Sequence, residues 1–273
     1  MKKYILSLLV AVGLIGNASA QAPSGDLANG LVGFWALNGT TQDSSSFNNT
    51  GTGYDLRLAS DRFGNANSAY YFDGTSSYID LGNQPQYNFG ASNFTLSSWV
   101  LSGPKQIDFT TYIIGKYTAP APSSYGLGTA VTAPDVYAYS FLNDINSLER
   151  TVTSFQSIQN KQWHSVIATY ERNSNLTVYI DGVLGGTTDI SMLQGEQSNT
   201  TSLVIGGINS NSIFGPQLFE GCISDVGIWN TALSSSQVSQ LYTIQSVPEP
   251  SAYALFAFGT IGMLMVMRRK KTA

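Results

Sequence analysis

The feature that most constrains the fold is the lack, in the middle of the chain, of an apolar helical period that lasts three turns. Short runs rich in β-branched and aromatic residues recur there instead, separated by Gly, Asn, Ser and Asp. The clearest run, 175–181, places alternate apolar residues on one face, namely Leu176, Val178 and Ile180. Asp181-Gly182 supplies the positive-φ positions of a tight hairpin, which predicts a three-strand meander from 163 to 184. Such regular strand spacing without intervening helices predicts an all-β sandwich.

Further strands are expected at 31–37, 69–72, 78–81, 94–101 and 112–115. Four tryptophans fall in predicted strands, and we expect most of their surface to be buried: Trp35, Trp99, Trp163 and Trp229.

Two local patterns refine this prediction. Phe94 and Leu96 share a parity that Trp99 breaks, which indicates a bulge or a strand buried on both faces. One short helix is predicted near the end of the domain, where Ser234 can cap the first turn and Gln237 can complete a capping box. Its apolar stripe is Val238, Leu241 and Tyr242.

Both ends of the chain differ from the middle. Residues 1–20 have two lysines, an apolar run and Ala18-Ser19-Ala20, which is typical of a cleaved signal peptide and predicts export through the Sec pathway. Near the other end, 252–267 are apolar, and at 1.5 Å per residue they span about 24 Å as a helix, slightly less than a ~30 Å hydrocarbon core. We therefore expect one C-terminal transmembrane helix in the inner membrane. A cytoplasmic basic cluster closes it, formed by Arg268, Arg269, Lys270 and Lys271. The part between, 21–246, is long enough for one domain.

The charge of this middle part excludes one class of partner. Of 13 Lys and Arg, six lie in the two end segments, and of 17 Asp and Glu only Glu249 does, so the net charge is 7 − 16 = −9. That sign repels phosphate backbones, which argues against nucleic-acid binding. A single cysteine, Cys222, and a single histidine, His164, exclude an internal disulfide and the usual structural zinc ligand sets.

Several blocks together resemble one family. They are Leu31-Val32-Gly33-Phe34-Trp35, Ala69-Tyr70-Tyr71-Phe72-Asp73-Gly74, Phe94-Thr95-Leu96-Ser97-Ser98-Trp99, Val178-Tyr179-Ile180-Asp181-Gly182 and Gly221-Cys222-Ile223-Ser224-Asp225. Their order, over roughly 31–242, resembles laminin-G-like (concanavalin A-like) domains, and the resemblance implies a jelly-roll sandwich of two antiparallel sheets. Such domains often hold one Ca²⁺, a hard cation that oxygen ligands suit. Its candidate ligands lie in or beside the blocks, first of all Asp43 and Asp225, with Asn48 and Asp73. The alternative, which we favour, is that Asp43 and Asp73 cap turns.

The C-terminal segment, 247–273, carries a second resemblance. Val247, Pro248, Glu249 and Pro250, followed by the apolar run and the basic cluster, resemble a PEP-CTERM sorting signal of Gram-negative bacteria. The resemblance implies an exosortase-like membrane protease as partner, and a destination at the cell surface or in the extracellular polysaccharide matrix. The alternative is an ordinary single-pass anchor.

The middle part of the chain lacks the sequence patterns that would indicate an enzyme. Glycosidases of this fold place carboxylates at alternate positions of one strand, whereas no two acidic residues of the middle part are two or four positions apart. No Gly-x-Ser-x-Gly elbow or phosphate loop is present. His164 is interpreted as a packing residue, and Cys222 as a buried, inert thiol.

Binding therefore remains as the predicted function. An aromatic stripe, Tyr137, Tyr139 and Phe141, could stack sugar rings but is interpreted as core, and loop aromatics are alternative platforms, namely Tyr54, Tyr87, Tyr125 and Phe214. The leading prediction is an exported, non-catalytic binding or adhesion module associated with carbohydrate or matrix. A purely structural matrix protein is the second hypothesis, and a glycan-active hydrolase or lyase is the third.

Overall fold

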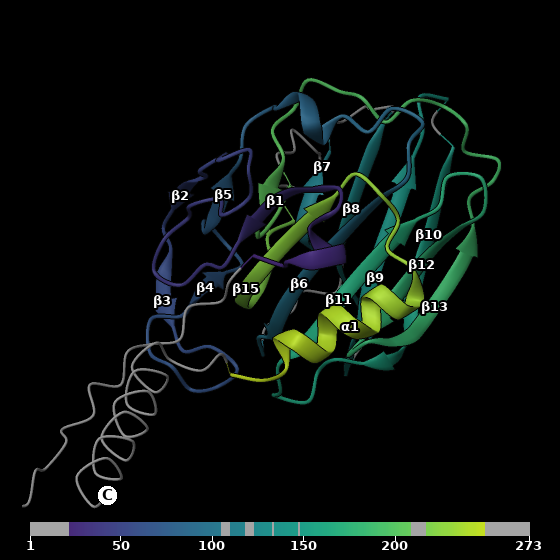
Figure 1. Ribbon diagram of the computed structural model, residues 1–273. Helices are drawn as coiled ribbons and strands as arrows, with labels where there is room; N and C mark the ends of the chain where they lie inside the picture. The colour runs from purple at the N-terminus through teal and green to yellow at the C-terminus, as the bar shows by residue number, and fades with distance from the viewer. Residues whose placement is uncertain are drawn as a thin grey trace, which may run out of the picture. The chain divides into compact units, whose positions relative to one another are not determined.

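Two antiparallel β-sheets pack face to face in the computed structural model, which describes residues 22–104, 110–117, 123–132, 134–146, 148–208 and 217–248 (Figure 1). The first sheet, sheet A, has eight strands. Seven follow the order β13 (Val183–Asp189), β12 (Asn175–Ile180), β11 (His164–Tyr170), β6 (Phe94–Ser102), β15 (Glu220–Trp229), β4 (Ala69–Asp73) and β3 (Arg57–Ala59). The eighth, β1 (Leu31–Trp35), pairs with the second half of β15.

The second sheet, sheet B, has seven strands. Their order is β10 (Glu149–Ser157), β9 (Asp135–Asn143), β8 (Ser124–Thr132), β7 (Thr111–Lys116), β14 (Val204–Ile205), β5 (Tyr78–Asp80) and β2 (Thr52–Tyr54). Two 3₁₀ turns, η1 (Gly25–Ala28) and η2 (Pro85–Tyr87), and one helix, α1 (Ser235–Gln245), complete the domain. The predicted jelly-roll sandwich is confirmed. Although 69–72 and 78–81 are both strands, the turn at Asp73 carries the chain from one sheet to the other.

The main core lies between the sheets, and the period-two pattern puts it there. Leu176, Val178 and Ile180 of β12 all point into it, as the alternation predicts. The predicted meander is also confirmed, because β12 pairs with β11 on one side and with β13 on the other. At its hairpin, Asp181 and Gly182 have φ of 52° and 76°, values that an Asp-Gly turn accommodates.

Helix α1 covers the outer face of sheet A, across β11 and β6 (Figure 1). Its capping box is formed as predicted, since Ser234 Oγ accepts from the N–H of Gln237 and the Gln237 side chain accepts from the N–H of Ser234. Val238 and Leu241 are buried against the outer face, where each contributes roughly 1.5–3 kcal/mol. Strand β6 is consequently buried on both faces, which explains the parity that Trp99 breaks.

A bulge accompanies this arrangement, but in the neighbouring strand. The register between β15 and β6 shifts between Ser224 and Gly227, and Asp225 has a φ of 51°. Ile223 and Val226 both belong to the core although they are three residues apart. The two residues between them therefore leave the simple alternation, which places the Asp225 carboxylate near the outer face of sheet A.

The structure corrects two predictions about aromatic residues in part. Trp163 precedes β11 instead of lying in it, but it is only partly exposed, so the expectation that most of its surface is buried holds; the other three tryptophans are buried in strands. The stripe Tyr137, Tyr139 and Phe141 lies on β9 opposite the main core, because Val136, Ala138 and Leu142 occupy that core, although Phe141 is buried in a second, smaller apolar cluster. Its partners across β8 include Gly126 and Gly128, so the rings lie over positions without side chains.

Candidate functional site

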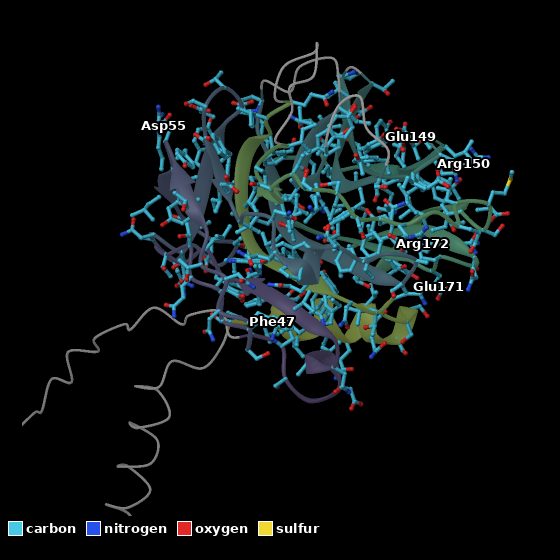
Figure 2. All side chains as sticks on the ribbon, turned by 90° about the horizontal axis from the view of Figure 1, so that it is seen from above. Phe47, Asp55, Glu149, Arg150, Glu171 and Arg172 are labelled. Atoms are coloured by element: carbon cyan, nitrogen blue, oxygen red, sulfur yellow. The ribbon has the colours of Figure 1, made fainter. Side chains whose placement is uncertain are left out.

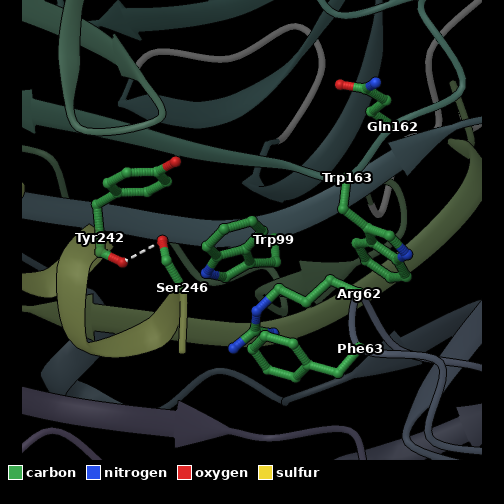
Figure 3. A pocket seen from close by; sticks show the side chains of 7 residues that line it. All are labelled: Arg62, Phe63, Trp99, Gln162, Trp163, Tyr242 and Ser246. Carbon is green, nitrogen blue, oxygen red and sulfur yellow. Dashed lines mark hydrogen bonds between the residues drawn. The ribbon is translucent and has the colours of Figure 1, made fainter. Parts of the chain in front are cut away.

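A pocket of about 390 Å³ opens on the outer face of sheet A, where α1 ends (Figure 3). Three parts of the chain form it: the loop before β4, strand β6 with the turn that leads into β11, and the last turn of α1. Its lining residues are Arg62, Phe63, Trp99, Gln162, Trp163, Tyr242 and Ser246.

Trp99 and the end of α1 form one wall. The ring of Tyr242 stacks on that of Trp99, with 5.8 Å between centroids and 18° between planes. The indole Nε1 of Trp99 donates to Oε1 of Gln245 at 2.9 Å. Ser246 Oγ donates to the carbonyl of Tyr242, which satisfies one of the free carbonyls at the helix end. The last helical turn is thus attached to the sheet by both packing and hydrogen bonds.

A short polar turn positions Arg62 and Phe63. Asp61 Oδ1 accepts hydrogen bonds from the N–H groups of Phe63 and Asn65, both at 2.9 Å, and Oδ2 accepts from Asn65 Nδ2. Gly64 has a φ of 81°, which the turn requires and which a residue with Cβ rarely adopts. The turn directs the Arg62 guanidinium between two rings, 4.4 Å from the centroid of Trp99 and 4.5 Å from that of Phe63.

Two acceptors hold this guanidinium, the buried Asp225 and the half-buried Gln245. Its Nη1 lies 2.5 Å from Asp225 Oδ2, and its Nε donates to the carbonyl of Gln245 at 2.8 Å. Burial raises the pKa of Asp225, while the Arg62 charge and hydrogen bond oppose that shift. Asp225 Oδ1 is buried and has no hydrogen-bond partner among the residues that the structure describes. Arg62 therefore joins the bulge of β15 to the end of α1.

The opposite wall is formed by Trp163, which is half-buried, and by the exposed Gln162 (Figure 3). The only ionisable side chains among the seven lining residues are those of Arg62 and Tyr242, so the lining offers aromatic faces and neutral polar groups but no carboxylate. Such a lining can stack a ring and form hydrogen bonds with hydroxyl groups. It has no pair of groups for general acid and base catalysis.

His164 and Cys222 have structural surroundings. The His164 ring nitrogens lie 2.8 Å from Asp181 Oδ2 and 2.9 Å from Asn160 Oδ1, so the ring ties β11 to the hairpin turn. Cys222 is half-buried rather than fully buried, and burial raises the pKa of its thiol to about 11. The thiol is therefore protonated near neutral pH, in agreement with the interpretation of Cys222 as inert.

The candidate metal ligands have protein partners instead. Asp43 is buried, and its two oxygens accept four hydrogen bonds, from the N–H groups of Phe34, Ser45 and Asn49 and from Ser45 Oγ. A carboxylate offers about four lone-pair positions, so Asp43 has none left for a cation. Asp225 is paired with Arg62. Within the described ranges no group of three or more His, Cys, Asp or Glu could hold a metal ion. These residues do not fit a Ca²⁺ site.

Asp73 has the turn-capping role that the sequence also allowed. Its Oδ1 accepts from the N–H groups of Thr75, Ser76 and Ser77. Burial alone would raise the pKa of Asp73, but these hydrogen bonds outweigh it and hold the pKa far below its usual range. Asn48 has a φ of 54° within the Asp43 loop, and its amide donates to the carbonyl of Ser46.

The loop aromatics predicted as sugar platforms differ in their exposure. Tyr87 and Tyr125 are fully buried in the core, so their prediction as exposed platforms is wrong. Tyr54 is exposed on β2 and stacks on Tyr78 of β5 with 4.5 Å between centroids. Phe214 lies outside the described residues. The sequence reasoning missed Arg62 and Phe63 as site residues; the one local signal was the Asp61-x-x-Gly64 turn.

Charged residues are spread around the domain. Figure 2 shows Asp55 on the side opposite Glu149 and Arg150. The sorting motif begins at the domain boundary, where Val247 and Pro248 follow α1; Glu249, Pro250, the apolar run and the basic cluster 268–271 lie outside the described residues, as does the predicted signal peptide. In the part of the chain that the structure describes, no helix is long and apolar enough to cross a membrane.

Comparison with protein families agrees with this geometry. The profile of the concanavalin A-like lectin/glucanases superfamily (Laminin_G_3) matches residues 73–239, and that of the PEP-CTERM protein-sorting motif matches 246–270. The chain therefore belongs to the concanavalin A-like lectin/glucanase superfamily, and its sorting motif indicates an exported protein with a surface or extracellular destination. A comparison with proteins of curated function found no match.

Three similar solved structures show the same fold. Domain 4 of AbnA, a GH43 extracellular arabinanase from Geobacillus stearothermophilus, in complex with arabinotriose, has a TM-score of 0.58 at 21% identity, with coverage of 78% of this chain and 98% of that one. The binding domain of Paraclostridial Mosquitocidal Protein 1 has a TM-score of 0.62 at 15% identity, with coverage of 79% of this chain and 52% of that one. The binding domain of Botulinum Neurotoxin DC in complex with SialylT has a TM-score of 0.60 at 14% identity, with coverage of 80% of this chain and 52% of that one. The chain thus spans about half the length of the two toxin domains.

Proposed function

We propose that this chain is an exported, non-catalytic saccharide-binding module that acts at the cell surface or in the extracellular matrix. The observation that carries the proposal is the pocket at the end of α1, where Trp163 and Phe63 remain half-buried beside neutral polar groups. In this proposal an exosortase-like protease delivers the domain, which the sorting motif supports.

The aromatic rings of the pocket differ in how much of their surface is free to contact a ligand. Trp99 is 5% exposed and already stacked on Tyr242, so this pair forms a rigid wall. Trp163 keeps accessible surface, and none of the described residues accepts a hydrogen bond from its Nε1. An aromatic ring held by its surroundings can stack on the apolar face of a sugar at little entropic cost, while nearby polar groups reach the hydroxyls.

The similar structures support binding rather than catalysis. Two of them contain the saccharides named in their descriptions, arabinotriose and SialylT, and the third is described as a binding domain. At these identities the likeness concerns the fold, so the residues that bind saccharide in this chain are inferred from its own pocket.

The test is affinity electrophoresis of the purified protein through gels that contain individual polysaccharides. We expect retardation by at least one polysaccharide, and Trp163→Ala should weaken it at least tenfold because the variant removes the free stacking surface. Phe155→Ala is the matched control, since Phe155 is 77% exposed on β10 of the other sheet. Equal retardation of the wild type and Trp163→Ala would exclude this pocket as the site.

A further inference from the structure

Arg62 is the obvious group to bind an acidic sugar, because among the seven lining residues only Arg62 carries a positive charge. An arginine recognises a carboxylate best when two parallel N–H groups are free to form a bidentate pair. Whether Arg62 can do so decides which class of saccharide the pocket accepts.

The donors of Arg62 are largely committed within the protein. Nε donates to the Gln245 carbonyl and Nη1 to Asp225, and the two flat faces of the guanidinium lie over Trp99 and Phe63. Only 8% of its side chain is exposed. A bidentate contact with a ligand would require Arg62 to leave Asp225, which would then be a buried carboxylate without its counter-charge.

The charge around Arg62 is also unfavourable for an anion. The Asp225 carboxylate neutralises the positive charge of the guanidinium, and the Asp61 carboxylate is close enough to raise the pKa of Asp225. Counting these three groups gives +1 − 2 = −1. The whole of 21–246 carries a net charge of 7 − 16 = −9, so the long-range field repels an acidic polymer as well.

The remaining polar groups of the lining are neutral. Gln162 is exposed, Ser246 Oγ keeps lone pairs after donating to Tyr242, and Trp163 Nε1 has no acceptor among the described residues. Amide and hydroxyl groups both donate and accept, as sugar hydroxyls do. We propose that the pocket selects uncharged saccharides and discriminates against uronate and sialate sugars, with Arg62 acting as a positioning residue for Trp99 and α1. This inference rests on the proposed function.

The experiment compares a neutral polymer with its acidic counterpart on the full-length protein in mild detergent. Galactan and polygalacturonate are one such pair, and glucan and glucuronan are another. We expect the neutral member of at least one pair to bind at least tenfold more tightly than the acidic member. The affinity for the neutral polymer should change less than twofold between 20 and 200 mM NaCl, because its binding releases no counterions. Asp61→Asn can keep both backbone hydrogen bonds through its amide oxygen. Because it removes one negative charge beside Arg62, it should reduce the difference in affinity between the neutral and the acidic polymer.

The outcomes separate this inference from the proposed function. The inferred preference for uncharged saccharides would be wrong if an acidic polymer bound more tightly, with an affinity that salt weakens and that Trp163→Ala abolishes. Saccharide binding at the pocket would still stand. Binding of neutral polymer that Trp163→Ala does not change would overturn the pocket and the inference together. Failure of the wild type to bind any member of the panel would overturn saccharide binding itself.

Discussion

Replacing Asp43 with asparagine tests whether this carboxylate organises a loop or binds a metal. Its Oδ1 accepts from the N–H groups of Phe34 and Ser45, and its Oδ2 accepts from Asn49 N and Ser45 Oγ. In Asp43→Asn the amide oxygen keeps the first two bonds. The new NH₂ faces the N–H of Asn49, which loses its acceptor, whereas the Ser45 hydroxyl can rotate to accept.

The expected loss follows from these bonds. A buried donor left without a partner costs about 1–3 kcal/mol, and hydrogen bonds to a charged acceptor contribute about 1 kcal/mol more than those to a neutral one. For the two bonds that change from charged to neutral and the one that is lost, we expect a loss of about 3–5 kcal/mol. At roughly 2–4 °C per kcal/mol for a domain of this size, the Tm should fall by about 6–20 °C.

Urea unfolding and thermal melts, each with and without millimolar Ca²⁺ and with chelator, are the assay. Asp73→Asn is the matched control: all three backbone donors of its turn bond the same oxygen, which an amide retains, so no donor loses its acceptor. Two of these bonds are exposed and the third is part-buried, so water can replace part of what the charge contributes, and the loss should be smaller than for Asp43→Asn. We expect the wild-type Tm to be indifferent to Ca²⁺ and chelator. A wild-type Tm that falls in chelator, together with an Asp43→Asn variant that no longer responds, would refute the reasoning and identify Asp43 as a ligand.

Three further predictions concern the packed wall, a buried cation and the tail. Trp99→Ala should lower the free energy of unfolding by about 3–5 kcal/mol, because a buried ring would leave a cavity beneath α1; a loss under 1 kcal/mol in urea titrations would contradict this packing. Burial lowers the pKa of Lys116 from 10.5 to about 8, so as the pH rises the folded protein releases this proton before the unfolded chain does. The free energy of unfolding of the wild type, measured relative to that of Lys116→Met, should therefore increase between about pH 8 and 10.5. A ¹³Cε NMR titration of Lys116 should show a midpoint near pH 8. A midpoint above pH 10 would mean that the oxygens of Asn83, Asn199 and Thr201 around its ammonium group stabilise the charged form more than burial destabilises it. Replacing Pro248-Glu249-Pro250 with three alanines should keep the full-length protein in the inner membrane, whereas mass spectrometry of the wild-type surface protein should find 252–273 removed; a retained basic peptide would identify a permanent anchor.

The sandwich could be predicted because its signals are local. Alternation at Leu176, Val178 and Ile180 and the positive-φ pair Asp181-Gly182 determine strand, face and hairpin within a dozen residues. The capping box at Ser234 is equally local. Each of these patterns describes neighbours in the sequence, and each was confirmed.

The aromatic residues were harder to place because an apolar face does not say what covers it. Tyr139 and Phe141 alternate as a core stripe would, yet Ala138 and Leu142 face the other sheet. Tyr87 and Tyr125 lie beside polar loop sequence, yet the Tyr125 hydroxyl donates to the carbonyl of Tyr87 inside the core. Which face is inside depends on the opposing sheet, and that pairing joins residues far apart in the sequence.

The pocket could not be predicted for the same reason. Its elements come from positions 62, 99, 163 and 242, which no sequence window brings together. Apart from the Asp61-x-x-Gly64 turn, the trace in the sequence was the parity broken by Trp99, which indicated a bulge or a strand buried on both faces without naming α1 or Arg62. Asp225 was predicted from the sequence as a candidate Ca²⁺ ligand, and in the structure its carboxylate is paired with the Arg62 guanidinium.

The same turn of helix completes the pocket and leads into the sorting motif, and this restricts where processing can occur. Gln245 accepts hydrogen bonds from both Arg62 and Trp99, and Ser246 both lines the pocket and begins the match to the sorting motif. Cleavage within or before the last turn would release Arg62 from the helix end and leave Trp99 without the Gln245 acceptor. Helix α1 ends at Gln245, and Pro248, which has no N–H and a fixed φ, disfavours its continuation two residues beyond Ser246. If the proposed exosortase-like protease needs extended chain, we expect it to cut beyond Ser246, so that the proposed sorting and binding can use adjacent residues without conflict.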